Sequence, residues 1–249
     1  MRRPLILLAA VVLLIGGLGP ASAQETAYEQ PNSFEWGERA LDVIIVPPSH
    51  GQLFNGNGVL GGSEGGAGEL TPFNSYLKAV EKAIADWDRA IATYGSPTLK
   101  ARLVTNVFVA GRDSIPTNVL LDPEIVVLWD EEKAIILGVS LRAANVCISD
   151  MSKSFISSFT YADMYNVGGH EYGHCLGLDH TLGPAGDPRI EHDIMFATYM
   201  DSPGDSGTHL HCMSNLNVAG LEQSFGAVLG KSGGDSAFIP ASQYQTIGC

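Results

Sequence analysis

The sequence predicts an α/β (α+β) fold, in which one mixed, twisted sheet carries a long helix and a second helix. Three observations lead to this prediction. A β-branched run spans residues 41–46 and ends at two prolines. Apolar residues recur at helical intervals from 72 to 94. Several strand-like runs then precede another helical segment, which starts near residue 160. This order of strands and helices is typical of an α/β sandwich.

The first elements follow one another in a simple order. Residues 41–46 predict a buried strand, and the glycine- and asparagine-rich residues 51–70 predict a surface loop. The helix predicted over 72–94 has one apolar face, formed by Tyr76, Val80, Ile84, Trp87 and Ile91. Strand-like runs come next, at 101–109, 118–129, 133–142 and 145–148.

The second helix has a clear start signal. Thr160 and Asp163 have the spacing of a capping box, in which each satisfies a backbone N–H of the other. Gly168 and Gly169 lie in the helix interior, where glycine costs about 1 kcal/mol relative to alanine. We expect these glycines to allow close packing of the helix backbone against the sheet.

The first 23 residues have the composition of a secretory signal. Arg2 and Arg3 precede an almost wholly apolar stretch, and Ala21-Ser22-Ala23 offers a small-residue cleavage site. The apolar stretch is shorter than the roughly 20 residues that span a bilayer, which favours cleavage over a retained anchor. We therefore expect a secreted, extracellular protein that does not associate with membranes after cleavage.

The chain that remains after cleavage is long enough for one sizeable domain. We place this domain at 41–230, after a stub at 24–40 and before a tail at 231–249. Removal of the signal takes away two arginines and no acidic residue, so the net charge changes from −13 to −15. This acidic balance argues against nucleic acid or an anionic membrane as a partner, and we expect a monomer.

Four cysteines follow the signal, at Cys147, Cys175, Cys212 and Cys249. An even number in an exported protein predicts two disulfides, for which three connectivities are possible. We favour Cys147–Cys175 and Cys212–Cys249. Cysteine ligands for a metal are a poor alternative, because the sequence has no Cys-x-x-Cys pair.

Residues 170–180 read His-Glu-Tyr-Gly-His-Cys-Leu-Gly-Leu-Asp-His and carry the strongest functional signal. His170 and His174 are four residues apart, so they face the same way on a helix. Gly177 can take the left-handed conformation that ends a helix, which lets His180 return as a third ligand. Three nitrogens leave the fourth position of tetrahedral Zn²⁺ open, as in catalytic sites. A helix with two histidines by chance explains this longer pattern poorly.

This pattern resembles the signature of the metzincin zinc peptidases. Further along, residues 193–199 resemble the methionine turn of that family, in which Met195 would form an apolar floor below the histidines. In the matrixin branch, aromatic residues after this methionine line the specificity pocket. Phe196 and Tyr199 occupy the matching positions.

Other comparisons with matrixins bear on the fold. Residues 216–226 resemble their closing helix, with Ser214 or Asn215 as the N-cap. Ala197 stands where the family has proline, and residues 182–192 predict an extra loop. The resemblance implies a metzincin-like catalytic domain, whose C-terminal subdomain is mostly irregular before that helix.

The resemblance also implies a function, that of a secreted endopeptidase with one catalytic Zn²⁺ held by His170, His174 and His180. Glu171 would be the general base, taking a proton from the zinc-bound water and passing it to the leaving amine. We expect the protein or peptide substrate to add as an extended strand to a sheet edge, for which residues 135–141 are our candidate.

Other functions remain open at this point. A non-catalytic secreted zinc-binding protein could share the fold, although the intact Glu171 argues against it, and a zinc hydrolase could act on a non-peptide bond. Residues 204–207 read Gly-Asp-Ser-Gly and imitate a serine peptidase segment with Ser206 as nucleophile. That mechanism needs a histidine and an aspartate upstream in a two-barrel all-β fold, so a turn is the better interpretation.

Two further groups could bind metal. His209 and His211 have the alternating spacing of ligands on one side of a strand, although packed or exposed histidines are the commoner explanation. Asp201 and Asp205 could bind Ca²⁺, but their spacing is not that of an EF-hand loop.

Overall fold

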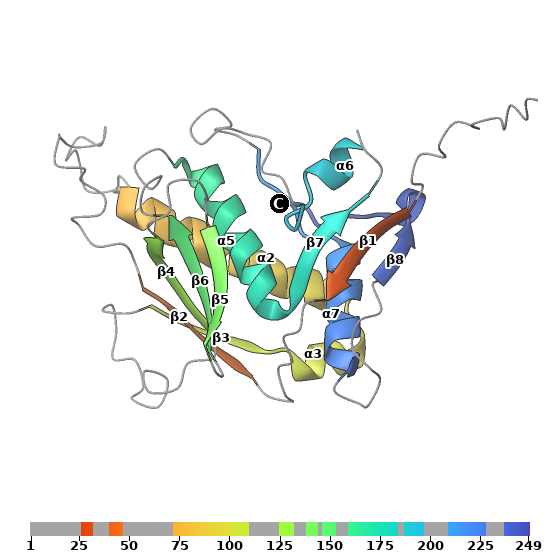
Figure 1. The fold of residues 1–249 in the computed structure, drawn as a ribbon, viewed down its shortest axis with the longest axis horizontal. Helices are drawn as coiled ribbons and strands as arrows, with labels where there is room; N and C mark the ends of the chain where they lie inside the picture. The colour runs from red at the N-terminus through yellow and green to blue at the C-terminus, as the bar shows by residue number, and fades with distance from the viewer. Residues whose placement is uncertain are drawn as a thin grey trace, which may run out of the picture.

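The computed structural model describes residues 26–31, 40–46, 72–109, 125–131, 138–143, 146–152, 159–183, 187–196, 209–227 and 237–249. At residues 26–31, 72–74, 130–131, 142–143 and 226–227 it describes the backbone alone. The predicted signal and the predicted loop over 51–70 lie outside the described residues. The described residues form a mixed α/β fold with two sheets (Figure 1).

The larger sheet has five strands, in the order β3 (Thr105–Val109), β2 (Leu41–Ile45), β4 (Ile125–Glu131), β6 (Val146–Ser152) and β5 (Gly138–Ala143). Neighbouring strands are parallel except β5, which runs antiparallel to β6. In β2, Leu41, Val43 and Ile45 are fully buried, as the β-branched run predicts. The sheet is mixed, and β5 forms one of its edges.

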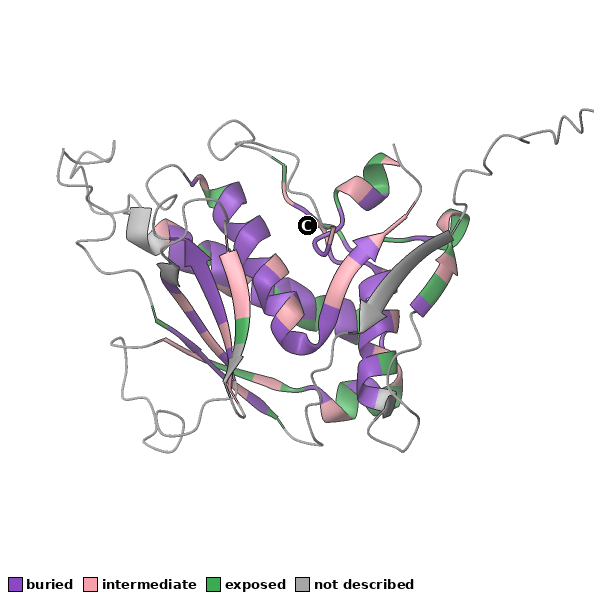
Figure 2. Ribbon diagram, in the orientation of Figure 1, coloured by how far each residue is buried: buried purple, intermediate pink, exposed green. Residues whose placement is uncertain are grey.

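The two helices expected from the sequence are present. Helix α2 (Pro72–Tyr94) buries all five residues of its predicted apolar face. Helix α5 (Tyr161–Leu176) begins with the capping box of Thr160 and Asp163 and ends at Gly177, whose φ of 115° and ψ of 17° are left-handed. The predicted start and the predicted end of this helix are therefore both confirmed. Figure 2 shows α5 buried along most of its length.

The glycines inside α5 bring it close to α2 more than to the sheet. A Cβ added at Gly168 would lie 2.9 Å from Val80 of α2 and 3.3 Å from Met151 of β6. The carbonyl of Gly169 accepts a hydrogen bond of 2.9 Å from Nε1 of Trp87, which is also on α2. Close packing against the sheet is therefore confirmed at Gly168 through Met151, although the tightest contact of Gly168 is with Val80 of α2.

A second sheet places β1 (Thr26–Pro31) between β7 (Leu178–Leu182) and β8 (Ala237–Pro240), antiparallel to both. β1 lies within the predicted stub, and β8 lies within the predicted tail. Helix α7 (Asn215–Ala227) packs against β1. Its start has the expected cap, because Oγ of Ser214 accepts a hydrogen bond from the backbone N–H of Asn217.

Two short helices occur where the sequence predicts a strand and a loop. The strand predicted over 101–109 begins only at 105, because α3 (Pro97–Arg102) occupies the preceding residues, with Ser96 as N-cap. The extra loop predicted over 182–192 contains α6 (Pro188–Glu191), which is capped by Asp187.

Both favoured disulfides are present. Cys147 of β6 is bonded to Cys175 of α5, with a Cα–Cα distance of 5.5 Å, so the second helix is fixed covalently to the sheet. Cys212 is bonded to Cys249, with a Cα–Cα distance of 5.4 Å. No helix in the described part of the chain is long and apolar enough to cross a membrane.

Candidate metal centre

The three histidines of residues 170–180 lie together. Their ring centroids are 4.6 Å apart for His170 and His174, 4.9 Å for His174 and His180, and 5.3 Å for His170 and His180. One nitrogen from each ring lies within 4.8 Å of the others. Within the described ranges, no other group of three or more His, Cys, Asp or Glu side chains meets this criterion. These three imidazoles could hold a metal ion.

Backbone carbonyls orient the two histidines of α5. Nδ1 of His170 lies 2.7 Å from the carbonyl oxygen of Ile194, and Nδ1 of His174 lies 2.8 Å from that of Leu178. A carbonyl only accepts, so each Nδ1 carries the proton and each Nε2 keeps a lone pair. The two Nε2 atoms lie 3.1 Å apart. Lone pairs that face each other at this distance suit a cation, so the donor set fits a metal ion.

The same histidines are neutral near pH 7. Burial lowers the pKa of His170 to about 4, against the raising effect of its hydrogen bond to Ile194. Burial, with a smaller contribution from the nearby His170 ring, also lowers the pKa of His174 to about 4. Metal ligation requires neutral imidazole. The two rings on α5 are therefore in the state that can bind a metal.

His180 reaches the site from β7, because the chain reverses at Gly177 directly after α5. Its neighbour Asp179 holds the backbone there, with Oδ1 accepting a 2.9 Å hydrogen bond from the N–H of His180. The same oxygen lies 3.5 Å from Nδ1 of the His180 ring. The third ring therefore returns to the site after the turn at Gly177, as predicted, and it comes from a strand.

Glu171 is buried beside the histidines. Its carboxylate oxygen Oε2 lies 2.8 Å from Oγ of Ser140, on the edge strand β5. Burial raises the pKa of Glu171, while His174 and the Ser140 hydroxyl lower it and Asp150 raises it further. A buried carboxylate with a raised pKa is a stronger base than one in water.

Met195 lies against the middle of α5. A Cβ added at Gly173 would be 2.3 Å from Sδ of Met195, so only glycine fits at this point of the helix. The Met195 side chain is fully buried. The backbone carbonyl of Met195 accepts a 2.8 Å hydrogen bond from the N–H of Thr181. Met195 thus fills the space that Gly173 leaves beside the helix, and its backbone is tied to β7 through Thr181.

The residues predicted for a specificity pocket are described only in part. Phe196 is partly buried and packs against a small apolar cluster that includes Ile190, Leu216 and Tyr244. Tyr199 lies outside the described residues, as do Ala197, Asp201, Asp205 and Ser206. The pocket, the calcium site and the serine nucleophile therefore stay predictions.

Asp193 is a fully buried residue whose role no local sequence pattern indicates. Its Oδ1 accepts hydrogen bonds from Oγ1 of Thr181 at 3.0 Å, from the N–H of Met195 at 2.8 Å and from Nδ2 of Asn217 at 2.9 Å. Its Oδ2 accepts two more, each 2.6 Å long, from the hydroxyls of Ser214 and Tyr244. Burial raises its pKa, and the Ser214 hydrogen bond is the largest effect that lowers it. One carboxylate therefore connects β7, the Met195 segment, α7 and the C-terminal residues.

Among the described residues, His209 and His211 belong to no group of three or more side chains close enough together to hold a metal ion. The ring of His192 is near both, with ring centroids 6.1 Å from His209 and 5.5 Å from His211. These separations exceed those among the three histidines of residues 170–180. Instead, Asn166 of α5 holds this segment, through hydrogen bonds with the carbonyl of His209 and the N–H of His211.

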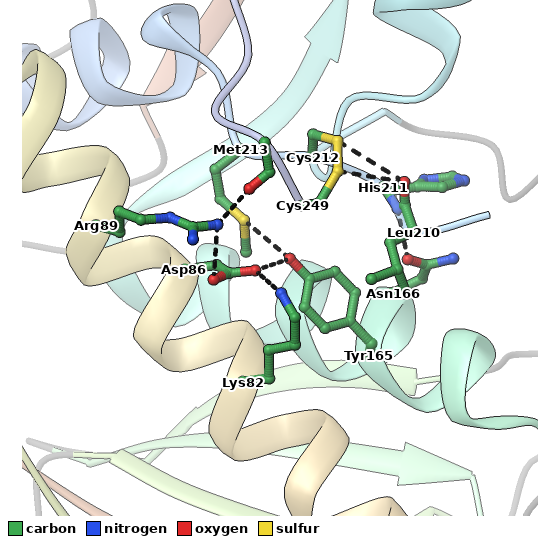
Figure 3. Close-up of polar contacts among 11 residues, drawn as sticks. Lys82, Asp86, Arg89, Tyr165, Asn166, Leu210, His211, Cys212, Met213 and Cys249 are labelled. Atoms are coloured by element: carbon green, nitrogen blue, oxygen red, sulfur yellow. Dashed lines mark hydrogen bonds and ion pairs between the residues drawn. A yellow bond between two sulfur atoms is a disulfide. The ribbon is translucent and has the colours of Figure 1, made fainter. Parts of the chain in front are cut away.

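A cluster around Asp86 links α2 to α5 and to the C-terminal residues (Figure 3). Asp86 of α2 is buried, accepts a 2.7 Å hydrogen bond from the Tyr165 hydroxyl and pairs with Lys82 and Arg89. Arg89 also donates to the carbonyl of Gly248, next to the Cys212–Cys249 disulfide. The cluster therefore joins α2, α5 and the end of the chain.

Comparisons with known proteins add little to this description. No protein-family model and no curated protein matches the sequence. Among solved structures, the chain is similar to one described as the GM1 bound form of the ECX AB5 holotoxin. The two share 10% sequence identity, with a TM-score of 0.37 over 72% of this chain and 76% of that chain. A likeness this distant carries no argument about function.

Proposed function

We propose that this protein is a secreted, zinc-dependent endopeptidase of the metzincin type, closest to the matrixin branch. The observation that carries the proposal is the convergence of His170, His174 and His180, with one nitrogen from each within 4.8 Å of the others. Glu171, one residue after the first of them, supplies a buried carboxylate at the same place. This combination suits hydrolysis better than it suits a purely structural metal site.

The histidines would hold Zn²⁺, and Glu171 would handle the proton. A zinc ion bound by three neutral imidazoles supplies Lewis acidity for water and for a substrate carbonyl. Glu171 accepts a proton from the attacking water and then delivers it to the nitrogen of the leaving amine. Its raised pKa supports this role, because a base in this position must hold the proton between the two transfers.

The substrate is a protein or peptide in an extended conformation. β5 lies at the edge of the five-stranded sheet. At residues 138–141 it overlaps the segment 135–141, which is predicted from the sequence as the edge that pairs with the substrate. An edge strand offers unpaired backbone groups with which a peptide can pair. In this proposal, Phe196 and Tyr199 line the pocket that selects a hydrophobic residue just after the scissile bond.

Export is a further part of the proposal. The composition of residues 1–23 is that of a cleaved signal, and two disulfides are typical of proteins from oxidising compartments. Mass spectrometry of the protein released by secreting cells tests this part. We expect its first residue to be Gln24.

The decisive experiment combines metal analysis with cleavage of a mixed peptide library. Wild type is expected to contain one zinc ion per chain and to cut the library. Glu171→Ala is expected to keep the zinc and to lose activity by about 10²-fold or more, the usual contribution of a general base. Glu81→Ala, which changes a glutamate of α2, is the matched control and should behave as wild type.

Three results would contradict the proposal. Cleavage by Glu171→Ala at the wild-type rate would show that another group is the base. A zinc-containing wild type that cuts no peptide would favour a binding protein or a hydrolase of other bonds. Wild type without any transition metal would remove the basis of the whole mechanism.

A further inference from the structure

The edge strand β5 presents two residues to Glu171. Ser140 and Gly138 are two positions apart, so both face the same side of the sheet. Oγ of Ser140 lies 2.8 Å from Oε2 of the Glu171 carboxylate and 2.7 Å from the backbone carbonyl oxygen of the same residue. One hydroxyl therefore contacts both the carboxylate and the backbone carbonyl of Glu171.

Gly138 provides the space in which the carboxylate lies. A Cβ added at this position would be 2.7 Å from Cγ and 3.0 Å from Oε1 of Glu171, and 3.0 Å from Cγ1 of Val167. Real Cβ atoms do not approach other atoms as closely as 2.7 Å. Any other residue at position 138 would therefore displace Glu171 or the strand.

We propose that Ser140 is a positioning residue that holds the Glu171 carboxylate toward the metal centre, in a slot that Gly138 leaves open. This inference rests on the proposed function, in which Glu171 is the general base. A glutamate side chain has three rotatable bonds, and a base must be held in place to act efficiently. A hydroxyl that touches both the carboxylate and the backbone of Glu171 limits those rotations.

The serine hydroxyl suits this position because it is both donor and acceptor. It can donate its proton to the ionised carboxylate. It can also accept from a protonated carboxyl group while donating to the backbone carbonyl, which lies within the same reach. β5 is also the edge strand with which we propose the substrate peptide pairs. One strand would therefore align both the base and the peptide.

The test compares Ser140→Ala with Ser140→Thr in the full mature chain. Ser140→Ala is expected to lower kcat about 10–100-fold, as is typical when a residue that orients an active-site group is lost. KM should stay within about twofold, and the zinc content should remain one ion per chain. Ser140→Thr keeps the hydroxyl and should restore most of the activity.

Ser149→Ala is the matched control. Ser149 is the cross-strand partner of Ser140 on β6, and its buried hydroxyl has no hydrogen-bond partner among the described residues. This variant should keep the wild-type kcat. Gly138→Ala should reproduce the loss in kcat by displacing the carboxylate, although its hydroxyl at Ser140 is intact.

A wild-type kcat in Ser140→Ala would overturn the inference, and so would a loss confined to KM or to zinc binding. Crystal structures of Ser140→Ala and Gly138→Ala provide a readout that does not depend on activity. If the wild type cuts no peptide, the proposed function fails, but these structures still decide the inference. A displaced Glu171 carboxylate supports it, and an unmoved one contradicts it.

Discussion

Replacement of Asp193 by asparagine is expected to destabilise the domain strongly. The change keeps the size of the side chain, so it creates no cavity. An asparagine oxygen at the Oδ1 position can still accept from Thr181, Met195 and Asn217. The amide nitrogen at the Oδ2 position, however, faces the hydroxyls of Ser214 and Tyr244, which donate to the carboxylate in the wild type.

The magnitude follows from these two contacts. Both are 2.6 Å long, as is typical of hydroxyls bound to a carboxylate. Hydrogen bonds to charged groups contribute about 1.5–3 kcal/mol each. In the variant, weaker hydrogen bonds between neutral groups replace these two. The free-energy cost of burying a charge also disappears, which offsets part of the loss. We therefore expect the free energy of unfolding to fall by about 2–4 kcal/mol.

Thermal unfolding followed by circular dichroism measures the effect. For a domain of this size, about 2–4 kcal/mol corresponds to a decrease in Tm of roughly 5–15 °C. Asp187→Asn is the matched control, because asparagine is an equally good cap for α6 and only the ion pair with the exposed Arg189, which contributes little in contact with water, is lost. Equal Tm values for the two variants would refute the idea that Asp193 holds these elements together.

Other predictions concern a glycine of α5, the histidines and the metal. Gly173→Ala would place a Cβ 2.3 Å from Sδ of Met195, so we expect a loss of about 1–3 kcal/mol in urea unfolding. Gly248→Ala, where nothing lies within 4 Å, should leave stability unchanged, and equal effects would contradict the argument. The metal-free protein should lose stability as the pH falls from about 6.5 to about 4. His170 and His174, whose folded-state pKa values are about 4, stay neutral in this window while the unfolded chain is protonated. Urea unfolding at several pH values tests this, and a flat profile would contradict it. Incubation with 1,10-phenanthroline should abolish peptide cleavage, whereas phenylmethylsulfonyl fluoride should have no effect; the reverse result would favour a serine peptidase.

Local sequence signals predict much of this molecule. The helical periodicity of residues 72–94 and the capping box of Thr160 and Asp163 locate α2 and the start of α5, because both depend on contacts a few residues apart. The spacing of residues 170–180 places three imidazoles around one point for the same reason. Gly177 takes the left-handed conformation that its position in that pattern requires.

Structure that depends on distant partners is not predictable in this way. β1 reads Thr-Ala-Tyr-Glu-Gln-Pro, which has no apolar run, and it becomes a strand only by pairing with β7 and β8. The donors to Asp193 span residues 181 to 244, so no local spacing reveals them. The contact of Ser140 with Glu171 likewise joins residues 31 positions apart, on a strand and a helix.

The two disulfides differ in their access to solvent. Cys147 and Cys175 are fully buried, whereas Cys249 is exposed. Thiol reagents attack accessible sulfur atoms first. A mild reductant is therefore expected to open the terminal bond while the bond between sheet and helix persists, which gives a singly cross-linked species that can be purified. Peptide assays run in such a reductant would then report on a protein whose end is released but whose histidine-bearing helix is still tethered.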